Sequence, residues 1–181
     1  MKRPFAVSLA LLVLSSAAVA DTPAPYAGQQ DRAIKALSPE DIAGLRAGDG
    51  MALAKAAELN SYPGPRHVLD LAGPLRLDAR QKTASEAIQT AMRETARAIG
   101  AEAIEREAEL DHLFAAGSAE PATVERLTAA IGELQARLRA VHLNAHIAQR
   151  AVLNAEQIAR YDSLRGYAGA GGAPAHRGHH P

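Results

Sequence analysis

Apolar residues recur at alternating intervals of three and four along the second half of the chain. One stripe contains Val124, Leu127, Ile131, Leu134, Leu138, Val141, Ala145, Ala148 and Val152. A weaker stripe precedes it and contains Ile88, Met92, Thr95, Ile99, Ala103, Arg106, Leu110 and Leu113. This spacing places each set on one face of a helix that packs against another helix. The pattern therefore predicts two long helices, one over residues 79–116 and one ending near residue 152.

The segment "GSAEP" at residues 117–121 separates the two stripes. Its glycine suits the end of one helix and its proline suits the first turn of the next. Because so short a connection joins neighbouring helices in opposite directions, the sequence predicts a long antiparallel helical hairpin.

Three helix starts share the capping-box pattern, in which a cap side chain and the third residue after it bond each other's backbone N–H. The pairs are Ser38 with Asp41, Asp78 with Gln81, and Asn154 with Gln157. Short helices are also expected over residues 51–59 and within "RHVLDLA", with breaks at "YPGP" and at Gly73-Pro74. No alternating strand pattern of any length is present. The expected fold is all-α, with short N-terminal helices, the hairpin, and a short C-terminal helix.

A two-helix hairpin of this length buries only one stripe, so other surfaces must cover it. Leu143 and Ile147 lie roughly opposite the stripe of their own helix. We therefore expect a homodimer.

The two ends of the chain differ from the middle in composition. Lys2 and Arg3, an apolar run from Phe5 to Leu14, and the triplet Ala18-Val19-Ala20 are typical of a secretory signal peptide over residues 1–20, cleaved after Ala20. A membrane anchor is the alternative, but the apolar run is shorter than the ~20 residues that a spanning helix needs. We expect a flexible lead-in over 21–36, the helical domain over 37–167, and a disordered Gly/Ala/His tail over 168–181.

Charge and cysteine content exclude two classes of function. Without Lys2 and Arg3 the chain has 18 basic and 20 acidic residues, and this near-neutral balance argues against a nucleic acid partner. The chain has no cysteine, so thiolate catalysis and thiolate metal ligands are excluded. No serine or threonine has an assignable catalytic base, and no phosphate-binding glycine loop is present. The sequence therefore does not predict an enzyme.

His142 and His146 are four residues apart on one predicted helix, so both imidazoles can reach one metal ion. Leu143 stands where an "HExxH" metalloprotease needs its glutamate, which disfavours a zinc hydrolase. At 100° per residue both histidines are expected on a flank of the apolar stripe. The alternative interpretation is that they simply pack at the edge of the helix interface.

Further ligands for a divalent Zn, Ni or Cu ion are few. A hairpin centred near Ala119 would place His146 beside Met92, and His142 near Thr95 and Ala96. Met92 is a soft donor that suits copper(I), although a methionine on a stripe is more often core. His67 precedes the hairpin and could fold back to the same level. The tail cluster of His176, His179 and His180 could gather such ions weakly, whereas Glu109 and His112 are interpreted as solvated.

Two motifs, Leu77-Asp78-Ala79-Arg80-Gln81 and Leu153-Asn154-Ala155-Glu156-Gln157, open and close the predicted hairpin. Together with the signal peptide and the short helices, they resemble the LTxxQ motifs of the Spy/CpxP family of periplasmic stress proteins. Aspartate and asparagine replace the family's threonine, but both also cap helices. The resemblance implies a periplasmic, cradle-shaped helical dimer that binds unfolded clients or signals to a membrane partner.

The family's metal-sensing branch, related to CnrX, takes ligands from N-terminal histidines and from a His-x-x-x-Met pair on the late helix. His142 and His146 occupy that late position, with histidine in place of methionine, while only His67 is available upstream. The first hypothesis is a metal-responsive envelope-stress protein that signals to a sensor kinase or an anti-sigma complex. The alternative is an ATP-independent periplasmic holdase chaperone in which metal binding is incidental.

Overall fold

The computed structural model describes residues 24–168. Residues 24–30 form turns in a unit of their own. The described residues from 31 onward form a second unit with helices α1 (Pro39–Ala47), α2 (Lys55–Glu58), α3 (Pro65–Asp70), α4 (Ala79–Ala115), α5 (Pro121–Val152) and α6 (Ala155–Leu164). Across the described range the secondary structure is all-helical with no strand, as the sequence predicts. Within it, no helix has the length and apolarity needed to cross a membrane.

Two parts of the expected organisation lie outside the described residues, namely the signal peptide over residues 1–20 and the tail beyond residue 168. Within the expected lead-in, the structure attaches residues 31–36 to the helical unit. Ile34 is buried, and the backbone N–H of Lys35 donates to Asp111 on α4.

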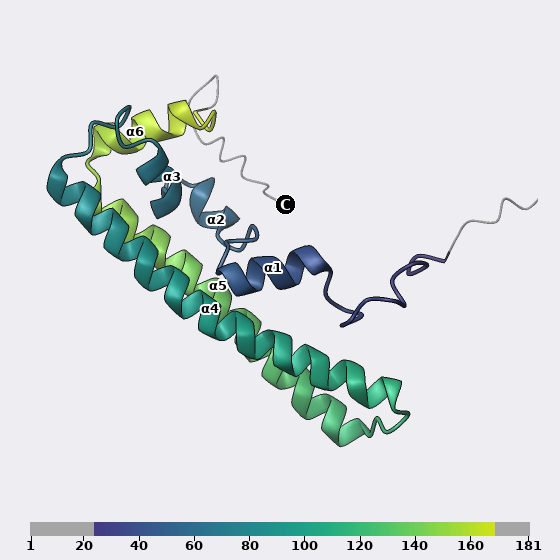
Figure 1. Ribbon diagram of the computed structural model, residues 1–181. Helices are drawn as coiled ribbons and strands as arrows, with labels where there is room; N and C mark the ends of the chain where they lie inside the picture. The colour runs from purple at the N-terminus through teal and green to yellow at the C-terminus, as the bar shows by residue number, and fades with distance from the viewer. Residues whose placement is uncertain (1–23, 169–181) are drawn as a thin grey trace, which may run out of the picture. The chain divides into compact units, whose positions relative to one another are not determined.

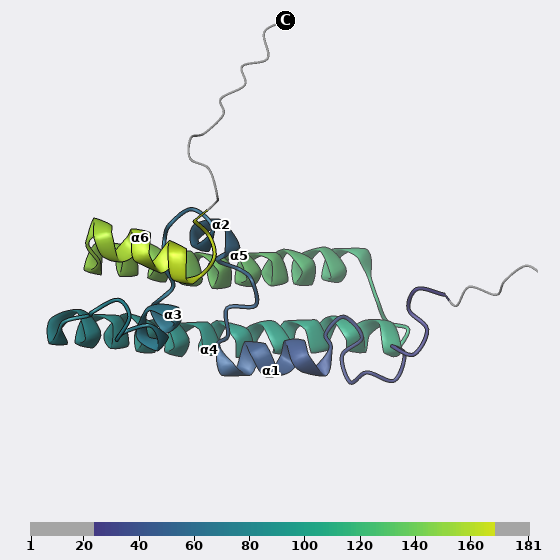
Figure 2. The same ribbon diagram turned by 90° about the horizontal axis from the view of Figure 1, so that it is seen from above.

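Helices α4 and α5 form the antiparallel hairpin, and they run side by side in both views (Figures 1 and 2). The helix α4 has 37 residues, which at 1.5 Å per residue gives a length of about 55 Å. Gly117 takes the left-handed conformation, with φ of 65°, and lets the chain turn away from α4. Helices α1 and α3 pack on α4, and α2 packs on α5.

The buried stripe of α5 is confirmed over most of its length but differs near its end. Leu127, Ile131, Leu134, Leu138 and Ala145 are buried as predicted. Val141 is half-buried and packs against the core cluster, whereas the prediction is wrong at Ala148, which is exposed. His142 and Gln149 are buried in addition. The reason is that a straight α-helix has 3.6 residues per turn, so a face followed at 3.5 drifts off the interface.

The facing stripe of α4 is built from small residues. Of the predicted stripe, Ile99 and Ala103 are buried, and the other buried residues of this helix are Ser85, Ala96 and Gly100. Thr95, which the stripe included, is exposed and bonds the carbonyl of Ala91 instead. The small side chains let α5 and α1 approach closely, since a Cβ added to Gly100 would lie 2.5 Å from the carbonyl oxygen of Leu45 in α1.

The register of the hairpin differs from the predicted one. Gln149 donates to Ser85 with a distance of 2.9 Å between Nε2 and Oγ. Counting seven residues along each helix from this pair brings His142 level with Met92. The prediction that Met92 lies beside His146 and that His142 lies near Thr95 is therefore wrong by about one turn, because the connection is shifted towards α4.

The short helices are shorter than predicted. The expected helix over residues 51–59 is reduced to α2, because Met51 and Ala52 have φ of 39° and 62° and so break the helical path. Likewise "RHVLDLA" is helical only to Asp70.

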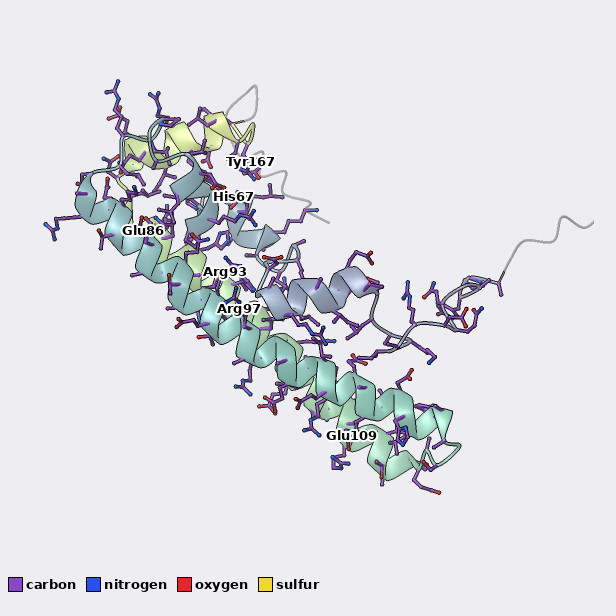
Figure 3. The ribbon with its side chains drawn as sticks, viewed as in Figure 1. His67, Glu86, Arg93, Arg97, Glu109 and Tyr167 are labelled. Atoms are coloured by element: carbon purple, nitrogen blue, oxygen red, sulfur yellow. The ribbon has the colours of Figure 1, made fainter. Side chains whose placement is uncertain are left out.

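Below α1, the carbonyl oxygen of Ala47 accepts hydrogen bonds from Arg93 and Arg97 of α4, which satisfies the C-terminal end of α1 (Figure 3).

All three predicted capping boxes are present. The last two are joined, because the amides of Gln81 and Gln157 bond each other in both directions with N–O distances of 2.9 Å. Gln81 also donates to the Val152 carbonyl, and Gln157 donates to the Leu75 carbonyl. The two motifs thus form one hydrogen-bonded unit that ties the start of α6 to the start of α4. A second apolar cluster lies alongside, with Val68, Leu75, Leu153 and Tyr161 buried.

Candidate functional site

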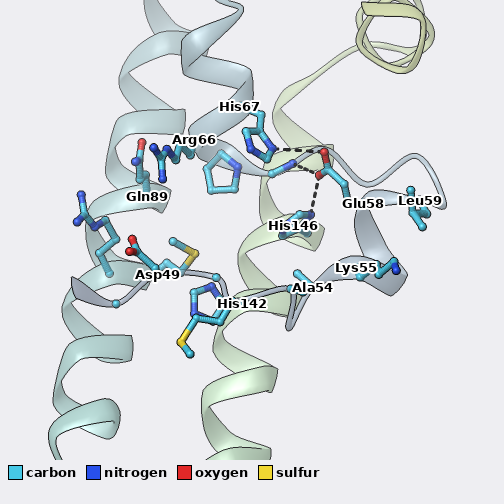
Figure 4. A pocket seen from close by; sticks show the side chains of 18 of the residues that line it. Asp49, Ala54, Lys55, Glu58, Leu59, Arg66, His67, Gln89, His142 and His146 are labelled. Atoms are coloured by element: carbon cyan, nitrogen blue, oxygen red, sulfur yellow. Dashed lines mark hydrogen bonds and ion pairs between the residues drawn. The ribbon is translucent and has the colours of Figure 1, made fainter. Parts of the chain in front are cut away.

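A cavity of about 440 Å³ lies where α2, the start of α3 and the loop over residues 48–54 face the hairpin (Figure 4). Four of its lining residues were predicted as candidate ligands from the sequence: His67, Met92, His142 and His146. They come from α3, α4 and α5, and the fold brings all four to one cavity. Because the predicted hairpin register was wrong, the sequence paired Met92 with the wrong histidine.

His142 lies in the interface of the hairpin, with only 2% of its surface exposed. It was expected on a flank of the stripe, and the drift of the helical face described above places it in the interface instead. Its Nε2 atom is buried and has no hydrogen-bond partner in the part of the chain that the structure describes. Burial lowers the pKa of His142, and the nearby His146 lowers it further, while Asp49 acts in the opposite direction. The side chain is therefore held in its neutral form, which is the form that binds metal ions.

His146 is held by the backbone of the loop that precedes α3. Its Nδ1 atom lies 2.7 Å from the carbonyl oxygen of Tyr62. Since a carbonyl can only accept, Nδ1 must carry the proton, and the neutral ring then has its lone pair on Nε2. Gly64 makes room for this ring, because a Cβ there would lie 2.9 Å from Cε1 and 3.1 Å from Nε2 of His146.

His67 is half-buried at the other side of the cavity, and its Nδ1 faces two oxygen atoms (Figure 4). Glu58 Oε1 lies 3.3 Å away and the hydroxyl oxygen of Tyr161 lies 3.4 Å away. An Nδ1–H donor directed at these acceptors leaves Nε2 of His67 free, as in His146.

Glu58 is the functional-site residue that the sequence reasoning missed. Its carboxylate is buried and lies between His67 and His146, with 3.7 Å from Oε2 to Nδ1 of His146. Oε1 accepts a hydrogen bond of 2.5 Å from Tyr161, and Oε2 accepts from the backbone N–H of Gly64 at 3.2 Å. No local pattern marks this glutamate, since a charged residue in a short helix ordinarily faces solvent. Residues distant in the chain bury it, since His67, His146, Tyr161 and Arg165 all lie against its carboxylate.

Tyr161 and Arg165 complete this hydrogen-bonded group from α6. Tyr161 is fully buried, and burial followed by the bond to Glu58 raises the pKa of its hydroxyl. Arg165 approaches Glu58 Oε1 to 3.5 Å through Nε. The buried carboxylate is thus neutralised by a cation and bonded by a tyrosine that remains protonated, which is what a buried charge requires.

The remaining sequence candidates are not part of this cavity. Glu109 lies towards the hairpin tip (Figure 3), where it pairs with Arg106 and Arg126, and His112 is exposed. His176, His179 and His180 lie outside the described residues. Within residues 24–168, no three His, Asp or Glu side chains are already close enough together to hold a metal ion.

A second cavity, of about 560 Å³, lies between α1 and the hairpin. Its apolar lining includes Leu37, Leu45, Met51, Leu53, Ala103, Ile131 and Leu138. Glu107 also lines it, and burial raises the pKa of this carboxyl. This cavity therefore offers mainly apolar contact area, and its lining among the described residues contains no histidine.

Comparison with known proteins gives one family. The family model described as "LTXXQ motif family protein" matches residues 66–165, which include both motifs, the hairpin and all of α6. No curated protein and no solved structure gives a significant match to the chain.

Proposed function

Since the chain belongs to the LTXXQ motif family, a family of Spy/CpxP-type periplasmic proteins, we propose that it binds a divalent metal ion in the histidine-lined cavity and responds to it. This role corresponds to the metal-sensing, CnrX-like branch of the family. The proposal includes export to the periplasm through residues 1–20, and it includes no catalytic step.

One observation carries the proposal. His67, His142 and His146 come from segments that are up to 79 positions apart in the chain, yet they line one cavity. Of the four histidines among the described residues, three line this cavity and only His112 lies elsewhere. Imidazoles that converge on a cavity are the typical ligands of Zn, Ni and Cu ions.

The hydrogen bonds of these rings fit a metal ligand. In His146 and His67 the Nδ1 atoms face oxygen acceptors. The lone pair of each ring is then on Nε2, where it can bind a metal ion. Metal-binding histidines commonly have this second hydrogen bond, which orients the ring. His142 has a buried Nε2 without a partner and a lowered pKa. A bound cation would remove that unsatisfied atom, whose burial otherwise costs free energy.

Two further donors set the expected choice of metal. Met92 lines the cavity at the level of His142, and Asp49 lines it from the loop after α1. Imidazole with a thioether suits nickel and copper better than magnesium or calcium, which need mainly oxygen ligands. When bound, the ion would supply a charged crosslink between these donors.

Such a crosslink would join α3 to α5. The end of α3 at Asp70 and the start of α5 at Pro121 are 51 residues apart in the chain, but the two helices are in contact. We propose that metal therefore restricts α2, α3 and the loop before them, and so changes the surface presented to a membrane-bound partner, a sensor kinase or an anti-sigma complex. A homodimer remains our expectation for the form that makes this contact.

Metal titration tests the proposal. The chain from residue 21 is titrated by calorimetry with Zn(II), Ni(II) and Cu(II), together with a His142→Ala/His146→Ala variant. His112→Ala is the control, since that histidine is exposed near the hairpin tip. The tail histidines are removed in all versions so that they do not contribute. Equal affinity in the double variant and in the control would refute the proposed site.

The second cavity favours the alternative function, an ATP-independent holdase. Its apolar lining between α1 and the hairpin could receive apolar side chains of unfolded client proteins. This reading predicts suppression of client aggregation at near-stoichiometric protein, equally with metal and with a chelator. Leu53→Glu would place a charge in that cavity and should abolish suppression. No suppression by excess unmodified protein would rule out the holdase role.

A further inference from the structure

Positive charge dominates the lining of the histidine cavity. Lys55, Arg66 and Arg93 line it and form no ion pair within the described part of the chain. The lining contains two acids, Asp49 and Glu58. Glu58 is paired with Arg165, so within the described residues only Asp49 offsets these three cations. The cavity thus has an excess of two positive charges before any histidine is protonated.

Arg93 carries the clearest unsatisfied group among these cations. One terminal nitrogen donates to the carbonyl oxygen of Ala47 at 3.2 Å, but its Nε is buried and has no hydrogen-bond partner among the described residues. A guanidinium only donates and stays charged at every accessible pH. Its buried N–H therefore needs an acceptor, and an unpartnered one costs free energy. His142, itself buried and unpartnered at Nε2, faces the same cavity.

We propose that this cavity binds a small oxyanion, a carboxylate or phosphate group, at its arginine side. Arg93 and Arg66 would receive the negative oxygens through charge-assisted hydrogen bonds, which are the strongest that these side chains form. A cavity of about 440 Å³ is far larger than a single metal ion needs and falls in the range of small-molecule sites. The anion site stands independently of the metal proposal.

If both ligands bind, they should assist each other. The uncompensated lysine and arginine charges repel a divalent cation, and a bound anion would reduce that repulsion. By linkage, the anion then raises the affinity for the metal by the same factor as the metal raises the affinity for the anion.

The test measures anion binding to the metal-free protein. The chain from residue 21 is treated with a chelator, dialysed, and titrated by calorimetry with succinate and, separately, with inorganic phosphate at low ionic strength. Arg66→Gln removes an exposed cation whose side chain forms no hydrogen bond within residues 24–168, and Arg93→Gln removes the buried donor. In the second variant Arg97 still bonds the Ala47 carbonyl, so α1 keeps its terminal contact. Arg160→Gln, at an exposed position outside the cavity, is the control for net charge.

We expect millimolar or tighter binding of at least one anion, weakened about tenfold or more by Arg93→Gln and less by Arg66→Gln, with no change in Arg160→Gln. A preference between succinate and phosphate identifies the class of oxyanion. Absence of binding by both probes, or equal binding in all variants, would overturn the inference. The metal titration of the histidine variants tests only the proposed function, and the anion titration of the metal-free protein tests only this inference. Failure of one proposal is therefore distinguishable from failure of the other.

Discussion

Substituting Gln157 by alanine tests whether the two motifs act as one structural unit. The Gln157 side chain is 8% exposed and takes part in four hydrogen bonds. Its oxygen accepts from the Asn154 N–H and from Gln81, and its nitrogen donates to Gln81 and to the Leu75 carbonyl. Alanine removes all four. Within the described residues the Asn154 N–H and the Leu75 carbonyl are then left without a partner, while Gln81 keeps its bonds to Val152 and Asp78.

The magnitude follows from these lost bonds. A net contribution of about 0.5–1.5 kcal/mol for each intramolecular hydrogen bond, reduced because partly exposed partners regain water, gives a loss of roughly 2–4 kcal/mol. The part due to the capping box alone is about 1 kcal/mol. A loss confined to that value would mean that the Gln81–Gln157 amide pair adds nothing.

The assay is urea unfolding followed by circular dichroism at 222 nm, applied as a double-mutant cycle. Gln81→Ala, Gln157→Ala and the double variant are compared, with Gln135→Ala at an exposed position of α5 as control. Because both single variants break the same pair, the double variant should lose about 1–2 kcal/mol less than the sum of the two.

Additive free energies, with a coupling below about 0.3 kcal/mol, would refute the reasoning. The two capping boxes would then act as separate local devices, and the bonds between the glutamines would be incidental to stability.

Two further predictions concern α4 and His142. The folded state lowers the pKa of His142 below its ordinary 6.5. Because the unfolded chain therefore takes up the proton first, stability should fall as the pH drops below about 6.5. In the His142→Leu variant the free energy of urea unfolding should depend less on pH between pH 7.5 and 5.5, and an unchanged pH dependence would contradict this. Gly100→Ala should cost about 1–3 kcal/mol by overpacking against the Leu45 carbonyl. Gly132→Ala has nothing within 4 Å of the new Cβ and should stabilise α5 by about 0.5–1 kcal/mol. Thermal unfolding of the two variants tests both values, and similar effects would contradict the close contact between α1 and α4.

The sequence by itself determined the helices and most of their ends. Capping at Ser38, Asp78 and Asn154 involves residues three apart, so each start is a local event that a short window contains. The hairpin is equally accessible, because a turn with Gly117 between two apolar stripes allows only antiparallel neighbours. Local prediction was weaker at α2, where left-handed residues before Ala54 depend on how the loop packs.

Only the tertiary structure decided what surrounds the histidines. A drift of the helical face over several turns moved His142 from the flank into the interface, and the hairpin register brought Met92 to its level. Glu58 gained its role through contacts with Tyr161, which is 103 positions away. Such distances lie beyond any local pattern: the sequence sets which residues share a helix face, but the packing of one helix on another selects which faces meet.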